Sequence, residues 1–109
     1  MDTASNSKSP RYRVLGSESL RKDLDKLSPF LRERIIRELH KFGETGRGDI
    51  EKVEGAEGIW KLRVGDYRVF FYQEADEVRA MRVLHRSVAY RLDIIESLIK
   101  RAQREKRTA

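Results

Sequence analysis

The chain has 109 residues, of which 39% are charged and another 39% hydrophobic, a composition typical of one compact domain with a single core. The formal net charge of +6 favours anionic partners such as nucleic acid or an acidic protein. The lack of cysteine excludes disulfides, thiolate nucleophiles and cysteine-based zinc sites, and no apolar run reaches the roughly 20 residues of a membrane span.

Residues 1–10 are small and polar, and we expect them to form a disordered tail. Because this segment lacks the apolar core of a signal peptide, a cytoplasmic protein is expected. A short strand is predicted over Tyr12–Leu15, closed by Gly16. One domain is expected to span residues 11–100, followed by a basic tail at 101–109.

Two helices are predicted next, forming an αα-hairpin with one apolar side. Ser17 and Ser28 are the expected N-caps, and Pro29 fits the first turn of the second helix. Gly43 is predicted to end that helix. The apolar stripes consist of Leu20, Leu24 and Leu27 in the first helix and Leu31, Ile35, Leu39 and Phe42 in the second.

The second half of the chain is predicted to form a sheet and a last helix. Residues 43–58 hold five of the seven glycines and are expected to form a loop, with a short extended piece near Ile50–Val53. Two β-rich runs, 59–64 and 67–72, flank Gly65-Asp66, which fits a two-residue type II′ turn. A third strand is predicted at Val78–His85, and an amphipathic helix from Tyr90 to about residue 100.

Because helices and strands occur in blocks, the fold class is predicted to be α+β. The N-terminal strand and the αα-hairpin would pack on a mainly antiparallel sheet of about four strands, with the last helix completing the domain.

The predicted turn brings three cations to one face of the sheet. It pairs Arg63 directly with Arg68, and Lys61 shares their face because side chains alternate along a strand. Opposed like charges destabilise a sheet, and an anion between them would relieve this repulsion. Since the arginine fork matches phosphate oxygens, the cluster is interpreted as a phosphate site. The alternative is that an acid of the preceding loop folds over the cations and pairs with them; the candidates are Glu51, Glu54 and Glu57.

His85 is a candidate for proton transfer on the same face. If Ala75-Asp76 is also a two-residue turn, Val83 lies opposite Arg68 and His85 reaches the cationic face, although a bulge would change this register. Nearby cations disfavour the imidazolium form and leave a histidine able to exchange protons near neutral pH. A structural or merely exposed histidine is the alternative.

Tyr90 follows where strand gives way to helix. Its ring is interpreted as a plate on which a nucleobase of single-stranded RNA stacks, or as a core residue covering the start of the helix. Arg86 and Arg91 flank it, and together with Lys52 they are predicted RNA contacts.

The run Gly-Ile-Trp-Lys-Leu-Arg-Val-Gly-Asp-Tyr-Arg-Val-Phe-Phe-Tyr at residues 58–72 and the later His-Arg-x-x-x-Tyr at residues 85–90 resemble the RelE/ParE superfamily of toxins from toxin–antitoxin pairs. The resemblance extends from Tyr12 to about Ile99. RelE-type members cleave mRNA, mostly on the ribosome and without metal, by attack of a ribose 2′-hydroxyl on the adjacent phosphate. The resemblance thus implies an endoribonuclease that inhibits translation, uses no cofactor, and has mRNA, the ribosome and a cognate antitoxin as partners.

Carried over by position, the resemblance assigns Arg68 to the scissile phosphate and makes Lys61 and Arg63 basic residues of the same site. His85 or Arg86 falls where members place a proton donor, and Tyr90 matches an aromatic residue that positions a base.

One departure concerns the general base. Ile59 stands where the best-known member has a second lysine, so His85 or Lys61 would have to take the role of the base. The substitution also supports an alternative, a ParE-like toxin that binds and inhibits DNA gyrase without cutting RNA. A third possibility is a basic module that binds nucleic acid through phosphates alone. No transition-metal site is expected from two distant histidines and no cysteine.

Overall fold

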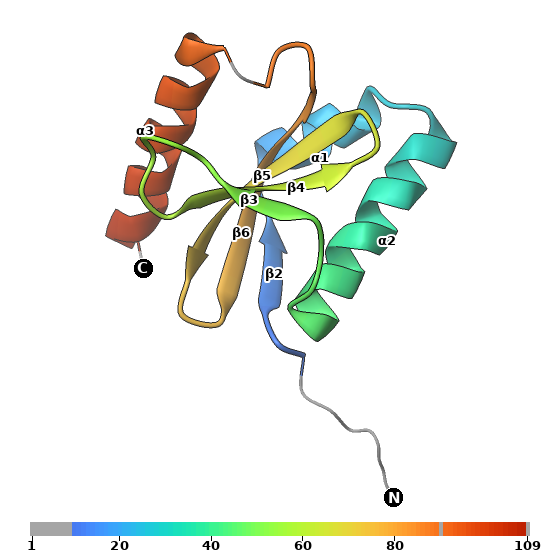
Figure 1. Cartoon of the computed structure of the whole chain (residues 1–109), viewed down its shortest axis with the longest axis horizontal. Coiled ribbons are helices and arrows are strands. Elements are labelled where there is room, and N and C mark those ends of the chain that lie inside the picture. The colour runs from blue at the N-terminus through green and yellow to red at the C-terminus, as the bar shows by residue number, and fades with distance from the viewer. Residues whose placement is uncertain (1–9, 90, 109) are drawn as a thin grey trace, which may run out of the picture.

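The computed structural model describes residues 10–89 and 91–108, so residues 1–9 of the predicted tail and Tyr90 lie outside the described residues. A five-stranded sheet in the order β2-β6-β5-β4-β3 forms the centre of the molecule. Helix α3 covers one face of this sheet, and helices α1 and α2 cover the other (Figure 1). The elements are β2 (Arg13–Gly16), α1 (Glu18–Asp25), α2 (Pro29–Thr45), β3 (Ile50–Lys52), β4 (Ile59–Val64), β5 (Tyr67–Glu74), β6 (Glu77–His85) and α3 (Leu92–Thr108).

This architecture confirms the predicted α+β class and adds one strand to the expected sheet. The extended piece expected in the glycine-rich loop is β3, which pairs antiparallel with β4 at one edge. At the other edge β2 runs parallel to β6, and all other strand pairs are antiparallel. Arg13 and Arg79 both donate hydrogen bonds to Glu77 beside β2, and these bonds lower the pKa of the Glu77 carboxyl below its ordinary value.

Each face of the sheet has its own core. The αα-hairpin packs on the face that carries Leu62, Val69 and Phe71, and α3 packs on the opposite face. The first core contains Leu20, Leu24, Ile35, Leu39, Phe42, Leu62, Val64, Val69, Phe71, Val78, Ala80 and Val83. The second contains Val53, Ala56, Ile59, Phe70, Tyr72, Met81, Ala89, Leu98 and Ala102.

Both predicted helix N-caps are confirmed. The Ser17 hydroxyl accepts a hydrogen bond from the backbone N–H of Leu20 at 3.0 Å. The Ser28 hydroxyl accepts one from Leu31 at 3.3 Å, with Pro29 as the first residue of α2. Each serine satisfies one of the N–H groups that a helix start leaves without a partner.

The predicted end of α2 at Gly43 is wrong. The helix continues to Thr45, and Gly46 ends it in the left-handed conformation with φ 72°. Gly43 is instead the point where β2 approaches the helix, because a Cβ at this position would lie 2.7 Å from Cγ2 of Val14. Its carbonyl accepts a hydrogen bond from the Tyr12 backbone N–H at 2.8 Å.

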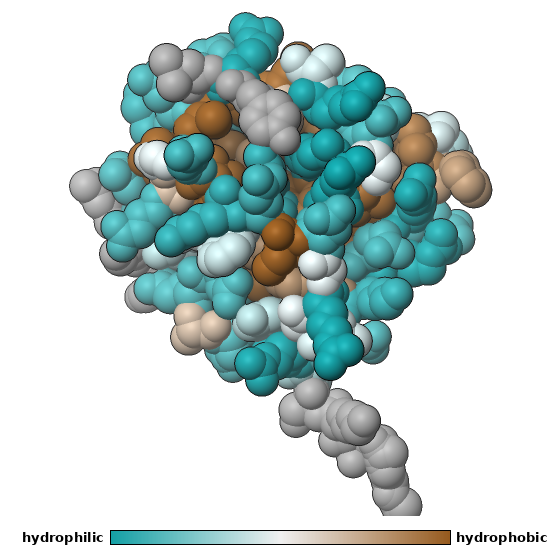
Figure 2. Space-filling view, viewed as in Figure 1, coloured by the Kyte–Doolittle hydropathy of each residue, from teal (hydrophilic) through white to brown (hydrophobic). Residues whose placement is uncertain are grey.

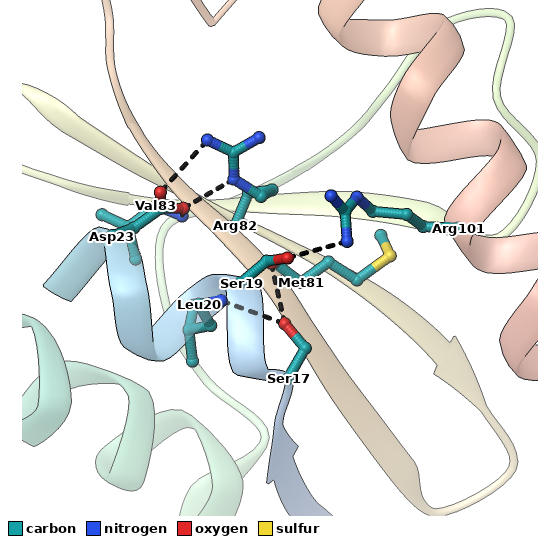
Figure 3. Close-up of polar contacts among 8 residues, drawn as sticks. All are labelled: Ser17, Ser19, Leu20, Asp23, Met81, Arg82, Val83 and Arg101. Carbon is teal, nitrogen blue, oxygen red and sulfur yellow. Dashed lines mark hydrogen bonds and ion pairs between the residues drawn. The ribbon is translucent and has the colours of Figure 1, made fainter.

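Helix α3 is longer than its apolar stripe predicted, since it runs past residue 100 to Thr108. Two contacts explain part of the extension. Ala102 is 5% exposed within the second core, and the Arg101 guanidinium donates a hydrogen bond to the Ser19 hydroxyl of α1 at 2.8 Å (Figure 3). The basic residues that were predicted to form a tail therefore continue the helix.

The β4–β5 hairpin has the predicted register. Val64 pairs with Tyr67 and Arg63 with Arg68, and the pairing continues to Ile59 and Tyr72. Gly65 has φ 58°, whereas Asp66 is not among the residues with positive φ. A positive φ at the first turn position alone is the signature of a type II′ turn.

The β5–β6 pair begins as predicted and then changes register. Glu74 pairs with Glu77, so Ala75-Asp76 is a two-residue turn. Further along, Phe71 pairs with Ala80 but Phe70 pairs with Arg82, which leaves Met81 as the extra residue of a β-bulge. The prediction that Val83 lies opposite Arg68 is therefore wrong, because the bulge moves every later residue of β6 by one position.

Asp23 of α1 binds the bulged part of β6 through hydrogen bonds. Its carboxylate accepts hydrogen bonds from Arg82 Nε at 2.7 Å and from the Val83 backbone N–H at 2.9 Å (Figure 3). Arg82 Nη2 donates to the other carboxylate oxygen at 3.1 Å. Asp23 itself is only 8% exposed. β2 ends before this part of β6, so the Asp23 carboxylate accepts the Val83 N–H bond that a neighbouring strand would otherwise accept.

The turn at Ala75 predicts a stabilising substitution. Ala75 has φ 54°, a conformation that costs an L-residue about 1–2 kcal/mol. Ala75→Gly removes this strain and loses roughly 0.5–1 kcal/mol to the greater freedom of glycine in the unfolded chain, so we expect a small net gain and a rise in Tm of a few degrees. Ala102→Gly, inside α3, is the control and should lower Tm. Equal destabilisation by both variants would contradict the strain at Ala75.

The Asp23 ion pair predicts a large loss of stability. Asp23→Ala leaves the partly buried Arg82 guanidinium and the buried Val83 N–H without their acceptor, and each buried group left unsatisfied costs about 1–3 kcal/mol. Urea unfolding should show a matching drop in the transition midpoint. The exposed Asp25 on the same helix is the control, with an expected effect of Asp25→Ala within about 0.5 kcal/mol. Similar midpoints for the two variants would refute a stabilising role for the pair.

Candidate functional site

Three cations meet at one small cavity beside the tip of the β4–β5 hairpin. Lys61 and Arg63 come from β4 and Arg68 from β5, and with Asp49 and Glu51 they line a cavity of about 90 Å³, which we call the basic pocket. Arg63 and Arg68 are directly opposed in the strand register. The prediction that the three cations share one face of the sheet is confirmed.

The basic pocket lies on the α3 face, but α3 leaves it open. The residues of α3 that are buried against the sheet pack around Ile59, Phe70 and Met81, farther from the hairpin tip. None of the α3 side chains that the structure describes lines the pocket. In Figure 1, α3 stands at one side of the sheet while the β4–β5 hairpin extends away from it. The pocket therefore stays open beside the exposed Arg63, while Lys61 and Arg68 are only 7% and 8% exposed.

Arg68 is held in place by the backbone of its own turn. It is 8% exposed, and its Nη1 donates hydrogen bonds to the carbonyl oxygens of Gly65 and Tyr67, both at 3.0 Å. Within residues 10–89 and 91–108, no acceptor is paired with its Nε or Nη2. A guanidinium fixed in this way is preorganised, because binding an anion requires no further ordering of the side chain.

Two carboxylates share the basic pocket with the cations. Glu51 lies opposite Lys61 in the β3–β4 register, with its Oε1 3.5 Å from Lys61 Nζ. Asp49 Oδ2 lies 4.0 Å from Arg63 Nε. Both acids are exposed, whereas Lys61 is only 7% exposed. An acid paired with the cations was the alternative that the sequence left open, and one of its three candidates, Glu51, does pair, but as part of strand β3.

His85 lies on the other face of the sheet. The bulge in β6 places it opposite Tyr67, and the two rings contact edge to face with centroids 5.3 Å apart. Its Nδ1 is 2.9 Å from the Ser87 hydroxyl. Because Tyr67 packs on the αα-hairpin core, the predicted position of His85 on the cationic face is wrong.

The other predicted RNA contacts are spread around the hairpin. Arg86 stands at its tip, where its backbone N–H donates to the Asp66 carbonyl at 2.8 Å and its Nε lies 3.7 Å from the Asp66 carboxylate. Lys52 pairs with Trp60 in the strand register, so it faces the α2 side, away from the basic pocket.

Arg91 precedes α3, and its guanidinium pairs with Asp93 at 3.2 Å rather than with the pocket acids. Tyr90 lies outside the described residues, and its predicted role in positioning a base stays a prediction.

Burial of position 59 explains why isoleucine stands here in place of the lysine of the best-known member. The side chain is 1% exposed and belongs to the core beneath α3. A lysine here would have to carry its charge into that core, at a large desolvation cost. Position 59 therefore supplies no proton acceptor to the basic pocket.

Asp49 was missed by the sequence analysis. The signal that could have found it is the alternation Asp49-Ile50-Glu51, which puts both carboxylates on one face once the segment is treated as a strand. The loop assignment concealed this pattern.

A larger cavity of about 390 Å³ lies between the β3–β4 loop and α3, but no cation is among the described residues that line it. Because phosphate recognition needs positive charge, the small basic pocket is the better candidate site. The lining residues of the larger cavity are Gly55, Ala56, Glu57, Gly58, Ile59, Tyr72, Gln73, Ile99, Ala102 and Gln103.

In the part of the chain that the structure describes, no three histidine, aspartate or glutamate side chains are placed to share a metal ion. None of the described helices is long and apolar enough to cross a bilayer.

Known proteins with the same fold identify the family. Residues 14–90 match the family described as "ParE toxin of type II toxin-antitoxin system, parDE". Toxin RelE3 of Methanocaldococcus jannaschii is 31% identical over 83 residues, which cover 72% of this chain and 94% of that protein.

Solved structures agree. The toxin in the RelB-RelE antitoxin–toxin complex of Methanococcus jannaschii matches with a TM-score of 0.61 and 26% identity, over 72% of this chain and 96% of the other. A mutant of the Escherichia coli toxin RelE in the free state has a TM-score of 0.64 and shares the fold at 22% identity, over 84% of this chain and 97% of the other. The chain therefore belongs to the RelE/ParE superfamily of toxins from type II toxin–antitoxin systems.

Proposed function

We propose that this toxin is a metal-independent endoribonuclease that cleaves mRNA on the ribosome in the cytoplasm and so inhibits translation. The observation that carries the proposal is the basic pocket, which Lys61, Arg63 and Arg68 line together. The named relative, a RelE toxin, supports the same class of function.

The pocket suits the stabilisation of a phosphate undergoing substitution. Arg63 and Arg68 lie on adjacent strands, so two planar guanidinium groups can contact different oxygens of one phosphate. Attack by a 2′-hydroxyl places extra negative charge on these oxygens, and fixed cations stabilise that charge more than they stabilise the ground state. The role of the two arginines is electrostatic.

The proton transfers are assigned to Glu51 and Lys61. Glu51 lies 3.5 Å from Lys61 and takes the place of the missing lysine base in this proposal. It accepts the proton of the 2′-hydroxyl as the O2′–P bond forms. The P–O5′ bond then breaks, and Lys61 donates a proton to the leaving 5′-oxygen. The products are a 2′,3′-cyclic phosphate and a 5′-hydroxyl.

The remaining predicted site residues have different roles in this proposal. His85 is not assigned to proton transfer, because it faces the opposite side of the sheet from the pocket. Arg86 at the hairpin tip contacts the RNA backbone, and Tyr90 keeps its proposed role in positioning a base.

A cognate antitoxin is proposed as the protein partner. Solved relatives include complexes of RelE toxins with RelB antitoxins. A pocket rich in cations favours an acidic, partly disordered antitoxin segment that folds as it binds and covers the site.

Substitutions in the basic pocket test the mechanism. Purified protein is added to a translating extract, and primer extension on the message measures cleavage. Arg68→Ala should lower the cleavage rate roughly 10²–10³-fold, as loss of one preorganised donor does. Glu51→Gln should lower it roughly 10²–10⁴-fold, the usual contribution of a general base. His85→Ala should cost far less than either.

Two control variants change exposed charged residues outside the basic pocket. Glu54→Gln alters an exposed carboxylate outside the pocket, and Lys41→Ala removes an exposed cation on α2; both should cleave like wild type. A message with a 2′-deoxy sugar at the cleavage position should resist cutting, because it lacks the attacking hydroxyl. Wild-type rates for both Arg68→Ala and Glu51→Gln would refute the assignment.

A second candidate function, binding and inhibition of DNA gyrase, is favoured by two observations. The matching family is described as a ParE toxin, and Ile59 removes the usual lysine. Gyrase supercoiling inhibited by purified protein, with intact message in the extract, would establish this function instead. Salt-sensitive RNA binding without any cleavage product would indicate a non-enzymatic module.

A further inference from the structure

Phe30 is an exposed aromatic residue that packing does not explain. It is the second residue of α2 and is 75% exposed, while the other exposed large hydrophobic residues, Leu15 and Ile36, are 38% and 39% exposed. Figure 2 shows that hydrophobic atoms appear on the visible face only in small patches among polar side chains. A single exposed apolar residue is ordinary by itself, so any role must follow from its neighbours.

Those neighbours connect Phe30 to the hairpin tip. Arg34 follows one turn later on the same side of α2, since residues four apart are adjacent on a helix. Its Nη1 lies only 3.1 Å from the position that a Cβ on Gly65 would occupy. The Arg34 side chain of α2 therefore packs against the turn of the β4–β5 hairpin.

Gly65 joins this surface to the basic pocket. Arg34 approaches the glycine from the α2 side, and Arg68 donates to the Gly65 carbonyl at 3.0 Å from the pocket side. Both guanidinium groups therefore lie beside Gly65, which has no side chain of its own. We call the line from Arg68 over Gly65 to Arg34 the basic ridge.

The acids beside this ridge are already paired. Asp66 at the tip lies 3.7 Å from the Arg86 guanidinium, and Glu33 lies 3.6 Å from Arg37. Their negative charge is offset locally, so it does not interrupt the positive ridge. The surface combines cations with one exposed aromatic ring, which is the combination that grips single-stranded nucleic acid.

We infer that Phe30 is a base-stacking platform for the single-stranded RNA that extends from the scissile phosphate over the hairpin tip. The inference rests on the proposed function for the location of the scissile phosphate in the basic pocket. Arg34 holds a phosphate beyond the tip, and an unpaired base of the same strand stacks on the Phe30 ring. A duplex cannot present a base in this way, so the ligand class is single-stranded RNA.

Binding of labelled oligonucleotides tests the inference. The probes carry 2′-O-methyl groups, which remove the nucleophile and prevent cleavage. One probe is a dinucleotide that occupies only the basic pocket, and the other is a longer single strand that can reach Phe30. Phe30→Leu should weaken binding of the longer strand roughly 5- to 150-fold, the range expected for loss of one base stack, and leave the dinucleotide unaffected.

Three further variants separate stacking from other effects. Phe30→Trp keeps an aromatic face and should bind the longer strand at least as tightly as wild type. Ile36→Ala removes another partly exposed apolar side chain from α2 and should have no effect. Arg34→Ala should weaken the longer strand and lower the salt dependence of its binding. Because Phe30 is exposed, Tm should not change.

The outcomes distinguish this inference from the proposed function. Equal affinity of Phe30→Leu and wild type for the longer strand would overturn the stacking platform even if cleavage is confirmed. Binding that follows the pattern above in a protein that never cleaves would overturn the nuclease and keep the platform. Loss of antitoxin binding in Phe30→Leu with unchanged RNA binding would assign the ring to the protein partner and refute the inference.

Discussion

The turn at Gly65-Asp66 is the constraint on which the basic pocket depends. Because side chains alternate along a strand, a slip of one residue in the β4–β5 pairing would send Arg63 or Arg68 to the αα-hairpin side and into the first core. The same turn supplies the carbonyl of Gly65 that orients the Arg68 guanidinium. One local backbone geometry therefore sets both the face on which the cations lie and the direction in which the most buried arginine points.

Features of the fold that depend on neighbours in sequence were predictable. The N-caps Ser17 and Ser28 and the β4–β5 register follow from residue types within a few positions of each other. The predicted end of α2 at Gly43 failed for a different reason. That glycine is required by the approach of Val14 from β2, a contact between segments far apart in the chain, and a helix-ending glycine looks the same in the sequence.

The residues of the candidate site also divide into those that local sequence predicts and those that depend on distant contacts. The cations of the hairpin were found because their positions follow from one turn. His85 was placed on the wrong face because β6 has a bulge at Met81, beside which Asp23, nearly 60 residues earlier in the chain, binds Arg82 and Val83. Asp23 offered a signal that was not used, since a carboxylate within the apolar stripe of a helix must have a buried partner, here Arg82. Glu51 was recognised as a partner for the cations, but as an acid folding over from the loop and not as the β3 residue directly opposite Lys61.

The position of Glu51 on β3 has a consequence for how the site responds to its environment. This strand is three residues long, forms one edge of the sheet and pairs only with β4. Short edge segments open by local fluctuation at a small fraction of the free energy needed to unfold a domain. The acidic side of the pocket can therefore separate from Lys61 while both cores stay intact. Warming or mild denaturant would act first on this local equilibrium, and the chemistry assigned to the pocket would be lost well before the fold.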